Sequence, residues 1–490
     1  MLLRLLTRSR RGLPGLLVLV IAAGLLLPGA RAASLPAQAT TTPVAAPDAL
    51  GGGPIPFTDL SPYGSNVFLH KEVEQAKIER TLQMAKDAGL LTLKQEFPWD
   101  EIEFKKGYFH DDKWNKSSWD KFDNIVATAE KYGITLVARI DHAPDWARLP
   151  DSSPGDHPRD PNDLADFVAT FLQHYNGRIK YVQVWNEPNL HGEWDDKGQV
   201  DPAGYVDLLK TVYTRAKQTD PNVVVLSAPM AITLEDWPKG DPQYRRNLNE
   251  LIYWQEMYLD GAKDYFDILS ANAYGLDQPP QAPPDPTVLN FRRVELLRDV
   301  MVRNGDAGKA IWFNEYGWNA SPTTLAQSEQ NLWRRVDPAV QAQWTVDGIA
   351  YARQHWPWAG VFFIWYLRQV GDIPPDKAEY YFQMLDPNFN PQPVYDAVKA
   401  AATGGTATPV AATPTLVVAT LAAATPTLAG TPPTATAPPG TVVLTPVGTP
   451  TPGPGAAQSE SSPVLLWLVL GGLLLVALGV GGSLLLRRRK

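Results

Sequence analysis

Between residues 56 and 400 the sequence alternates between two hydrophobic patterns, and this alternation restricts the fold more than any other feature. Short apolar runs typical of buried strands are separated by longer segments in which apolar residues recur every three or four positions, as on one face of a helix. Phe122, Ile125, Val126 and Ala129 form one such face. Short apolar runs between amphipathic helices indicate a parallel sheet covered by helices, because each strand is then buried on both faces.

The apolar runs are numerous enough to close the sheet on itself. Strands are expected at 64–70, 91–97, 134–140, 180–185, 223–228, 268–273, 310–313 and 361–365. Eight strand–helix units favour an α/β fold of the (β/α)8 TIM barrel type over 56–400, with functional residues at the C-terminal ends of the strands. A doubly wound open sheet is the alternative, and the lack of a Gly-rich phosphate loop after the first strand counts against it.

Both ends of the chain predict export and membrane attachment. Arginines precede an apolar run at 13–27 and a small-residue cleavage site at 30–32, so residues 1–32 are interpreted as a signal peptide, with an uncleaved anchor as the alternative. The run 464–486 carries no charge and is followed by four basic residues at 487–490. At about 1.5 Å per residue it spans about 34 Å, which predicts a transmembrane helix with a cytoplasmic basic tail. A buried soluble helix is the alternative.

Two low-complexity segments flank the expected barrel. Residues 33–55 are interpreted as a linker. Residues 401–463 are rich in Thr, Pro and Ala with Glu460 as their single charge, so they cannot bury enough apolar surface to fold and are expected to be a disordered stalk. Together with the ends of the chain, this organisation predicts a single-pass protein of the cell membrane whose barrel lies outside the cell.

Composition excludes several classes of function. The chain has no cysteine, which rules out disulfides, thiolate metal sites and cysteine nucleophiles. The formal net charge of -8 gives no reason to expect a nucleic-acid partner. The seven histidines form no metal-binding spacing, so neither a metal nor a cofactor is expected.

Two glutamates follow expected strands on opposing sides of the barrel. Glu187 lies in Asn186-Glu187-Pro188 after the fourth strand, and Glu315 lies after the seventh. Cleavage of a glycosidic bond requires one carboxylic acid to protonate the leaving oxygen and one carboxylate to attack the anomeric carbon. Glutamates at the tops of these two strands could face each other across the mouth of the barrel and supply that pair.

These segments resemble clan A of the retaining glycoside hydrolases, most closely the β-xylosidase-like family 39 and the cellulase-like family 5, over most of 56–400. The resemblance implies that Glu187 is the acid/base and Glu315 the nucleophile of a double displacement on β-linked oligo- or polysaccharides. It also implies supporting residues. Asn186 would bind the sugar 2-hydroxyl, and Tyr274 would donate a hydrogen bond to the nucleophile. Trp365 would form the floor of the subsite that holds the cleaved sugar, and Asn272 and Trp99 would line that subsite. For the tryptophans, core packing is the alternative.

The sequence departs from this pattern at two positions. Relatives carry an arginine on the second strand that holds the nucleophile ionised, and the matching residue here is Lys94, which lacks a planar fork. Arg139 on the third strand could compensate. Asn272 stands where relatives often have histidine. Asp141 and His142, which end the third strand, are candidates for either substrate contact or a structural hydrogen bond.

The sequence is therefore compatible with two functions. The first is a monomeric extracellular glycoside hydrolase acting on a carbohydrate, which both glutamates favour. The second is a non-catalytic carbohydrate-binding surface protein on a decayed barrel, which Lys94, Asn272 and the membrane stalk would suit.

Overall fold

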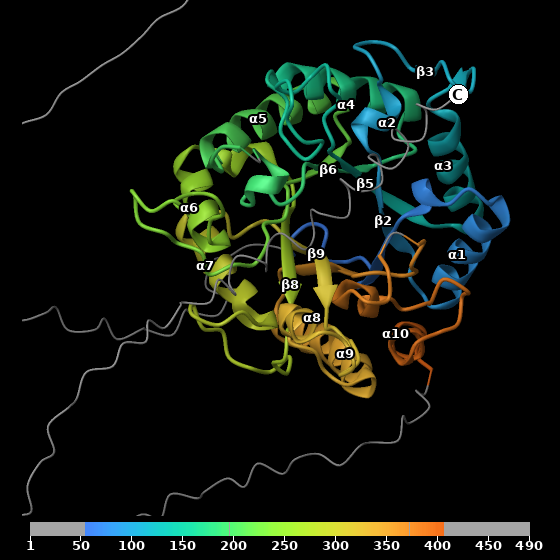
Figure 1. Ribbon diagram of the computed structural model, residues 1–490, viewed down its shortest axis with the longest axis vertical. Helices are drawn as coiled ribbons and strands as arrows, with labels where there is room; N and C mark the ends of the chain where they lie inside the picture. Colours follow the sequence, from blue (N-terminus) through green and yellow to red (C-terminus); the bar gives the residue numbers. More distant parts are fainter. Residues whose placement is uncertain (1–53, 196, 372, 406–490) are drawn as a thin grey trace, which may run out of the picture. The chain divides into compact units, whose positions relative to one another are not determined.

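A nearly closed barrel of parallel strands forms the centre of the protein (Figure 1). The computed structural model describes residues 54–195, 197–371 and 373–405, so the predicted signal peptide, transmembrane helix, basic tail and nearly all of the linker and stalk lie outside the described residues. The eight strands are β1 (Tyr63–Val67), β2 (Thr92–Glu96), β5 (Thr135–Ile140), β6 (Tyr181–Val184), β7 (Val224–Leu226), β8 (Leu269–Tyr274), β9 (Ile311–Gly317) and β10 (Ala359–Ile364). This confirms the predicted TIM barrel.

The strands pair in the order β7-β6-β5-β2-β1-β10-β9-β8. The two end strands of this order, β7 and β8, meet through a parallel bridge between Leu226 and Ile268, which brings the sheet close to closure. A doubly wound sheet would leave those two strands far apart, so the alternative is excluded.

Helices surround the strands as a ring (Figure 1). They are α1 (Gln75–Asp87), α3 (Asp120–Tyr132), α4 (Pro161–Tyr175), α5 (Pro202–Thr219), α6 (Glu250–Leu259), α7 (Val294–Arg303), α9 (Pro338–His355) and α10 (Pro393–Thr403), with short helices α2 (Trp99–Ile102) and α8 (Gln327–Trp333) and a small hairpin of β3 (His110–Asp111) and β4 (Lys116–Ser117). The last helix continues past the predicted domain end at 400. No helix within the described ranges is both long and apolar enough to cross a membrane.

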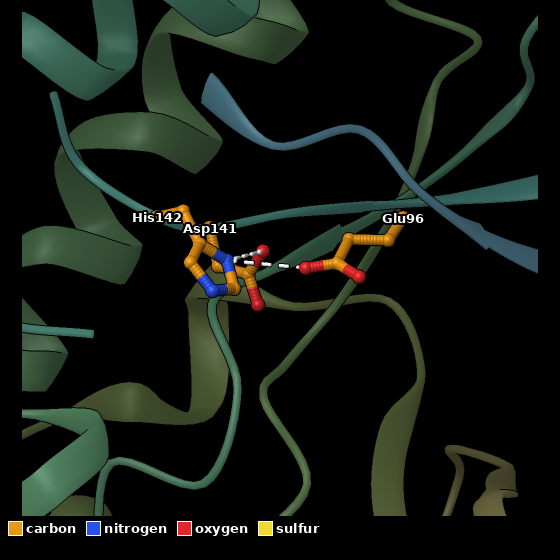
Figure 2. A group of neighbouring side chains, drawn as sticks. All are labelled: Glu96, Asp141 and His142. Atoms are coloured by element: carbon orange, nitrogen blue, oxygen red, sulfur yellow. Dashed lines mark hydrogen bonds and ion pairs between the residues drawn. The ribbon is translucent and has the colours of Figure 1, made fainter. Parts of the chain in front are cut away.

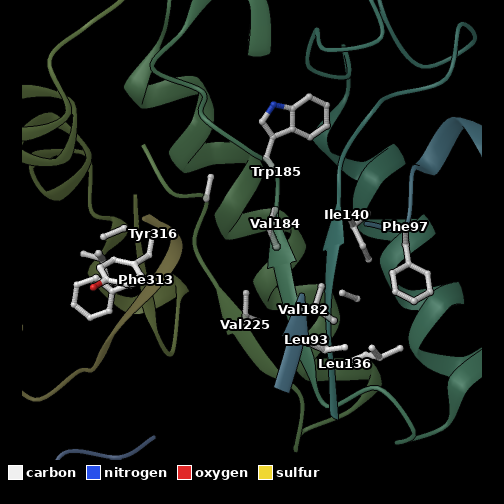
Figure 3. Packing of buried hydrophobic residues seen from close by; sticks show 14 of the residues in the cluster. Leu93, Phe97, Leu136, Ile140, Val182, Val184, Trp185, Val225, Phe313 and Tyr316 are labelled. Atoms are coloured by element: carbon white, nitrogen blue, oxygen red, sulfur yellow. The ribbon is translucent and has the colours of Figure 1, made fainter. Parts of the chain in front are cut away.

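Alternation along the strands produces two apolar layers. One set of side chains packs between sheet and helices, including Leu93, Leu136 and Val182 (Figure 3). Residues that alternate with this first set along the strands face the interior of the barrel. They form a second cluster of Val137, Tyr181, Val224, Leu226, Ile268, Ala310, Trp312, Val361 and Phe363. Ile55, Phe57 and Leu60 pack against this inner cluster, so the segment before β1 covers the N-terminal end of the barrel.

An irregularity in β9 interrupts the alternation. Ala271 of β8 lies opposite Phe313, but the next residue, Asn272, lies opposite Glu315, so Asn314 is an extra residue in the strand. Phe313 and Tyr316 belong to the outer apolar layer, and the two residues between them are both directed inward. The predicted end of this strand at 313 is therefore wrong, because β9 keeps pairing with β8 as far as Gly317.

A glycine in β1 allows three strands to approach closely. A Cβ atom at Gly64 would lie 2.7 Å from the Thr92 carbonyl oxygen and 2.9 Å from Val361 Cγ1. Gly64→Ala is therefore expected to lower the free energy of unfolding by about 1–3 kcal/mol, because backbone and a buried side chain would have to move. Gly308→Ala is the matched control, since nothing lies within 4 Å of its Cβ position. Urea unfolding of both variants measures the difference, and equal midpoints would contradict the prediction.

Candidate active site

The two predicted catalytic glutamates lie at the C-terminal end of the barrel. Glu187 follows β6 by three residues, and Glu315 lies within β9. The backbone N–H of Glu187 donates to the Pro229 carbonyl oxygen at 3.0 Å, which ties it to the segment after β7. Trp185 and Glu187 have φ angles of 71° and 36°, in the left-handed region that non-glycine residues rarely adopt. Backbone strain of this kind is typical of functional sites.

One amide joins the two carboxylates. Asn272 Nδ2 donates to Glu187 Oε1 at 2.6 Å and lies 3.4 Å from Glu315 Oε2. These two carboxylate oxygens are therefore no more than 6.0 Å apart, since they share one nitrogen at those distances. A residue after β6 and a residue of β9 thus converge on a single point at the mouth of the barrel.

Glu315 is held by a hydroxyl and a buried cation. Tyr274 OH donates to Glu315 Oε2 at 2.8 Å, and Lys94 Nζ lies 3.9 Å from Glu315 Oε1. Burial, followed by the negative charge of Glu315, raises the pKa of Tyr274 well above its usual value, so the hydroxyl keeps its proton and remains a donor. Burial lowers the pKa of Lys94 to about 8, although Glu315 opposes this shift. Around neutral pH the ammonium is therefore mostly charged.

Glu187 is in a different electrostatic environment. Burial is the largest cause that raises its pKa well above the usual value, and the neighbouring carboxylates Glu315 and Glu193 raise it further. The hydrogen bond from Asn272 opposes the shift without cancelling it. The two glutamates are thus differentiated, because Glu187 tends to hold a proton while Glu315 faces a hydroxyl donor and an ammonium group.

Several buried polar atoms around this pair have no hydrogen-bond partner within the described part of the chain. They include Asn186 Oδ1, Asn272 Oδ1 and Lys94 Nζ. Buried polar atoms are normally paired, so unpaired ones grouped around two carboxylates are suited to a water molecule or to the hydroxyl groups of a ligand. Asn186, predicted to bind a sugar hydroxyl, directly precedes Glu187 and is buried.

A network of charged groups lies beside the pair, on the β2 and β5 side. His142 Nδ1 lies 2.9 Å from Asp141 Oδ1 and 3.1 Å from Glu96 Oε1 (Figure 2). Burial alone would lower the pKa of His142, but the two carboxylates together raise it well above the usual value. Arg139 Nε donates to Asp141 Oδ2, and within the described ranges Arg139 makes no hydrogen bond to Glu315. Its charge reaches Glu315 only at a distance, so it does not replace the planar arginine fork that Lys94 lacks.

The same three side chains could also offer ligand atoms to a metal ion, since those atoms lie within 4.8 Å of one another. A protonated imidazole cannot bind a metal, and here Nδ1 is already shared by both carboxylates. The arrangement therefore suits an ion-pair network better than a metal centre.

The predicted tryptophans are placed differently. Trp365 directly follows β10, is partly exposed, and meets Phe68 edge-on at 5.5 Å. Trp99 has no exposed surface. Its ring stacks on Phe167 at 5.6 Å and its Nε1 donates to Glu103 Oε2 at 2.6 Å. The structure does not bring Trp99 to the site, and the packing alternative describes it correctly.

Two residues near the glutamates were not singled out in the sequence. Burial raises the pKa of Glu193 to about 7, and its charge acts on Glu187. Trp333 lies against Tyr274, with ring centroids 4.8 Å apart. Both residues lie in connections that follow strands. The sequence of such connections has neither a hydrophobic periodicity nor a motif from which a functional residue could be predicted.

Comparisons with known proteins show which family the barrel resembles. Residues 62–228 match the model of glycosyl hydrolase family 10, which includes Glu187 but ends before Glu315. The chain thus resembles the clan A glycoside hydrolases. The predicted resemblance is confirmed and supports a glycoside hydrolase. The matched model is that of family 10, whereas the motifs indicated families 39 and 5.

A solved structure supports the same fold. A family 39 glycoside hydrolase from Bacteroides cellulosilyticus WH2 has 20% identity and a TM-score of 0.51, and the match covers 70% of this chain and 63% of that one. A monomeric beta-xylosidase from Caulobacter crescentus CB15 has 18% identity and a TM-score of 0.48, covering 71% and 68%. The chain thus spans less than two thirds of the first of these relatives. No curated protein sequence matches the chain.

Proposed function

We propose that the protein is a retaining glycoside hydrolase that cleaves β-linked oligo- or polysaccharides by double displacement. The observation that carries the proposal is the Asn272 amide in contact with both glutamates, which limits the separation of their nearest oxygens to 6.0 Å. Retaining enzymes hold their carboxyl groups about 5–5.5 Å apart, whereas inverting enzymes need about 6.5–9.5 Å to admit a water molecule.

The two environments assign the roles. Glu187, whose pKa is raised, would give its proton to the glycosidic oxygen as the bond to the anomeric carbon breaks. A Glu315 oxygen would form a covalent bond to that carbon. Glu187, now ionised, would then remove a proton from water, whose oxygen displaces Glu315 and restores both groups to their starting states. The hydrogen bond from Tyr274 would keep Glu315 in position for attack.

The stereochemistry of the product tests the proposal. Hydrolysis of an aryl β-glycoside by the full-length protein, followed by proton NMR during the first turnovers, is expected to show the β-anomer of the sugar before mutarotation. If the α-anomer appears first, the mechanism is inverting and the assignment of Glu315 as nucleophile fails. Binding of glycans without any turnover would instead favour the non-catalytic alternative.

Lys94 is expected to limit activity at high pH. Its pKa of about 8 means that the ammonium is charged below that pH and neutral above it, so Glu315 loses its closest cation as the pH rises through 8. Deprotonation of Glu187 also reduces activity at high pH. Lys94→Arg separates the two causes, because a guanidinium stays charged. The alkaline limb of kcat/KM is expected to move to higher pH in this variant, and an unchanged limb would assign it to Glu187 alone.

We further propose that the barrel acts as a monomer outside the cell, held by a transmembrane helix at 464–486 and spaced from the membrane by the stalk. The apolar run, the basic residues after it and the N-terminal signal support this proposal. A chain truncated after residue 463 is expected to move from the membrane fraction to the medium with its activity intact. Retention of the truncated chain in the membrane would point to an uncleaved N-terminal anchor.

A further inference from the structure

Trp333, the last residue of α8, packs against Tyr274, which in turn donates a hydrogen bond to the proposed nucleophile Glu315. Its ring centroid lies 4.8 Å from that of Tyr274, and the Tyr274 hydroxyl lies 2.8 Å from Glu315 Oε2. We infer that Trp333 is a positioning residue that holds the Tyr274 hydroxyl against Glu315. This inference rests on the proposed function, because it assigns Trp333 a part in the same reaction.

Tyr274 is held by two rings that also contact each other. Phe382 lies 5.4 Å from Tyr274, and Trp333 meets Phe382 edge-on at 5.0 Å. The three residues come from segments belonging to β8, to the connection after β9 and to the connection after β10. Trp333 Nε1 also donates to Glu379 Oε1 at 3.1 Å, which fixes the orientation of its indole. The position of the tyrosine ring therefore depends on both neighbouring connections.

The helix that carries Trp333 is held mainly by polar contacts. None of the seven described residues of α8 is fully buried. Glu329 accepts from Lys377 Nζ and from the backbone N–H of Ala378, each at 3.0 Å. These two contacts attach α8 to the turn that contains Phe382. Glu329 thus anchors the helix at a point four residues before Trp333, away from the carboxylates.

This support matters because the Tyr274 hydroxyl lies closer to Glu315 than the Asn272 amide or the Lys94 ammonium does. Asn272 Nδ2 lies 3.4 Å from the same oxygen, and Lys94 Nζ lies 3.9 Å from the other. Hydrogen bonds weaken steeply as distance and angle depart from the optimum, so a small displacement of the tyrosine ring would leave Glu315 poorly oriented. A residue that fixes the ring therefore contributes to rate without touching the sugar.

A double-mutant cycle in the full-length protein tests the inference. Trp333→Ala is expected to lower kcat/KM for an aryl β-glycoside about tenfold, the size expected for loss of an aromatic pair. Trp333→Phe, which keeps a ring against Tyr274, is expected to restore most of the activity. In a Tyr274→Phe background the Trp333→Ala substitution should cause no further loss, because the hydroxyl it positions is already absent.

Two further variants separate positioning from a general effect on folding. Glu329→Ala keeps the Trp333 side chain but removes the anchor of α8. It is expected to lower kcat/KM by less than Trp333→Ala does, and this loss should also vanish in the Tyr274→Phe background. Trp344→Ala is the matched control, because Trp344 is partly buried on α9 and packs edge-on against Trp318 at 6.0 Å. It should alter thermal stability without altering kcat/KM.

The outcomes distinguish the inference from the proposed function. If the unsubstituted protein hydrolyses no β-linked substrate, both are overturned. If it is active and Trp333→Ala retains full kcat/KM, or loses as much activity with Tyr274→Phe as without it, the positioning role is overturned while the proposed function stands.

Discussion

Replacing Glu315 with glutamine is expected to lower kcat by more than about 10³-fold, because an amide cannot form the covalent bond to the anomeric carbon. The substitution keeps the shape of the side chain, so Tyr274 and Asn272 can still surround it. Steady-state hydrolysis of an aryl β-glycoside measures the loss. Mass spectrometry should show a covalent glycosyl-enzyme for the unsubstituted protein with a slowly released fluorosugar, and none for the variant.

A surface glutamate provides the control for this experiment. Glu130 on α3 is exposed and pairs with Arg178 at 2.7 Å. Glu130→Gln should leave kcat unchanged, since an exposed ion pair far from the barrel mouth contributes little. If Glu315→Gln kept an activity close to that of this control, Glu315 could not be the nucleophile.

Replacing Glu187 with alanine is expected to have an effect that depends on the leaving group. Loss of a general acid costs about 10²–10⁴-fold when the departing oxygen needs a proton, as it does for a sugar or an alkyl alcohol. A dinitrophenolate leaves without protonation, so its glycoside should still form the covalent intermediate, which then breaks down slowly for lack of a general base. Comparing kcat/KM for the two substrates measures the difference.

Azide offers a second test of the same variant. A small anion that fits the space left by Glu187→Ala can attack the intermediate without being deprotonated, so azide should raise kcat and yield a β-glycosyl azide. Equal losses for good and poor leaving groups, with no response to azide, would show that Glu187 has no acid/base role.

Local patterns were sufficient to predict most of the barrel. Strands such as β7 and β10 are short apolar runs that are buried on both faces. Pro202 and Pro338 mark helix starts, because a proline at the first helical turn loses no hydrogen bond. The end of β9 was missed for a physical reason. Asn314 and Glu315 are polar residues inside a strand, and what keeps that strand extended is pairing with β8, a contact that sequence periodicity does not contain.

The site was predictable only in part. Glu187 and Glu315 follow apolar runs in recognisable motifs, so both could be placed at the barrel mouth. Trp99 could not be distinguished from a sugar-binding ring, because the same residue type suits a buried stack. The double contact of Asn272 depends on how far β8 extends, and the location of Trp333 depends on how a connection folds back over a neighbouring strand. Neither of these two contacts can be predicted from residues that are close together in the sequence.

The extra residue in β9 has a consequence for engineering. Because of it, two consecutive polar residues, Asn314 and Glu315, both face the interior between Phe313 and Tyr316, which pack outside. Asn314 Nδ2 donates to Gln183 Oε1 of β6, while the adjacent Glu315 accepts from Tyr274. Deleting Asn314 would restore regular alternation and leave Glu315 facing inward, but it would remove the amide that links β9 to β6 next to the proposed nucleophile. Grafting this pair of glutamates onto another scaffold would therefore require transferring that supporting amide together with the acids.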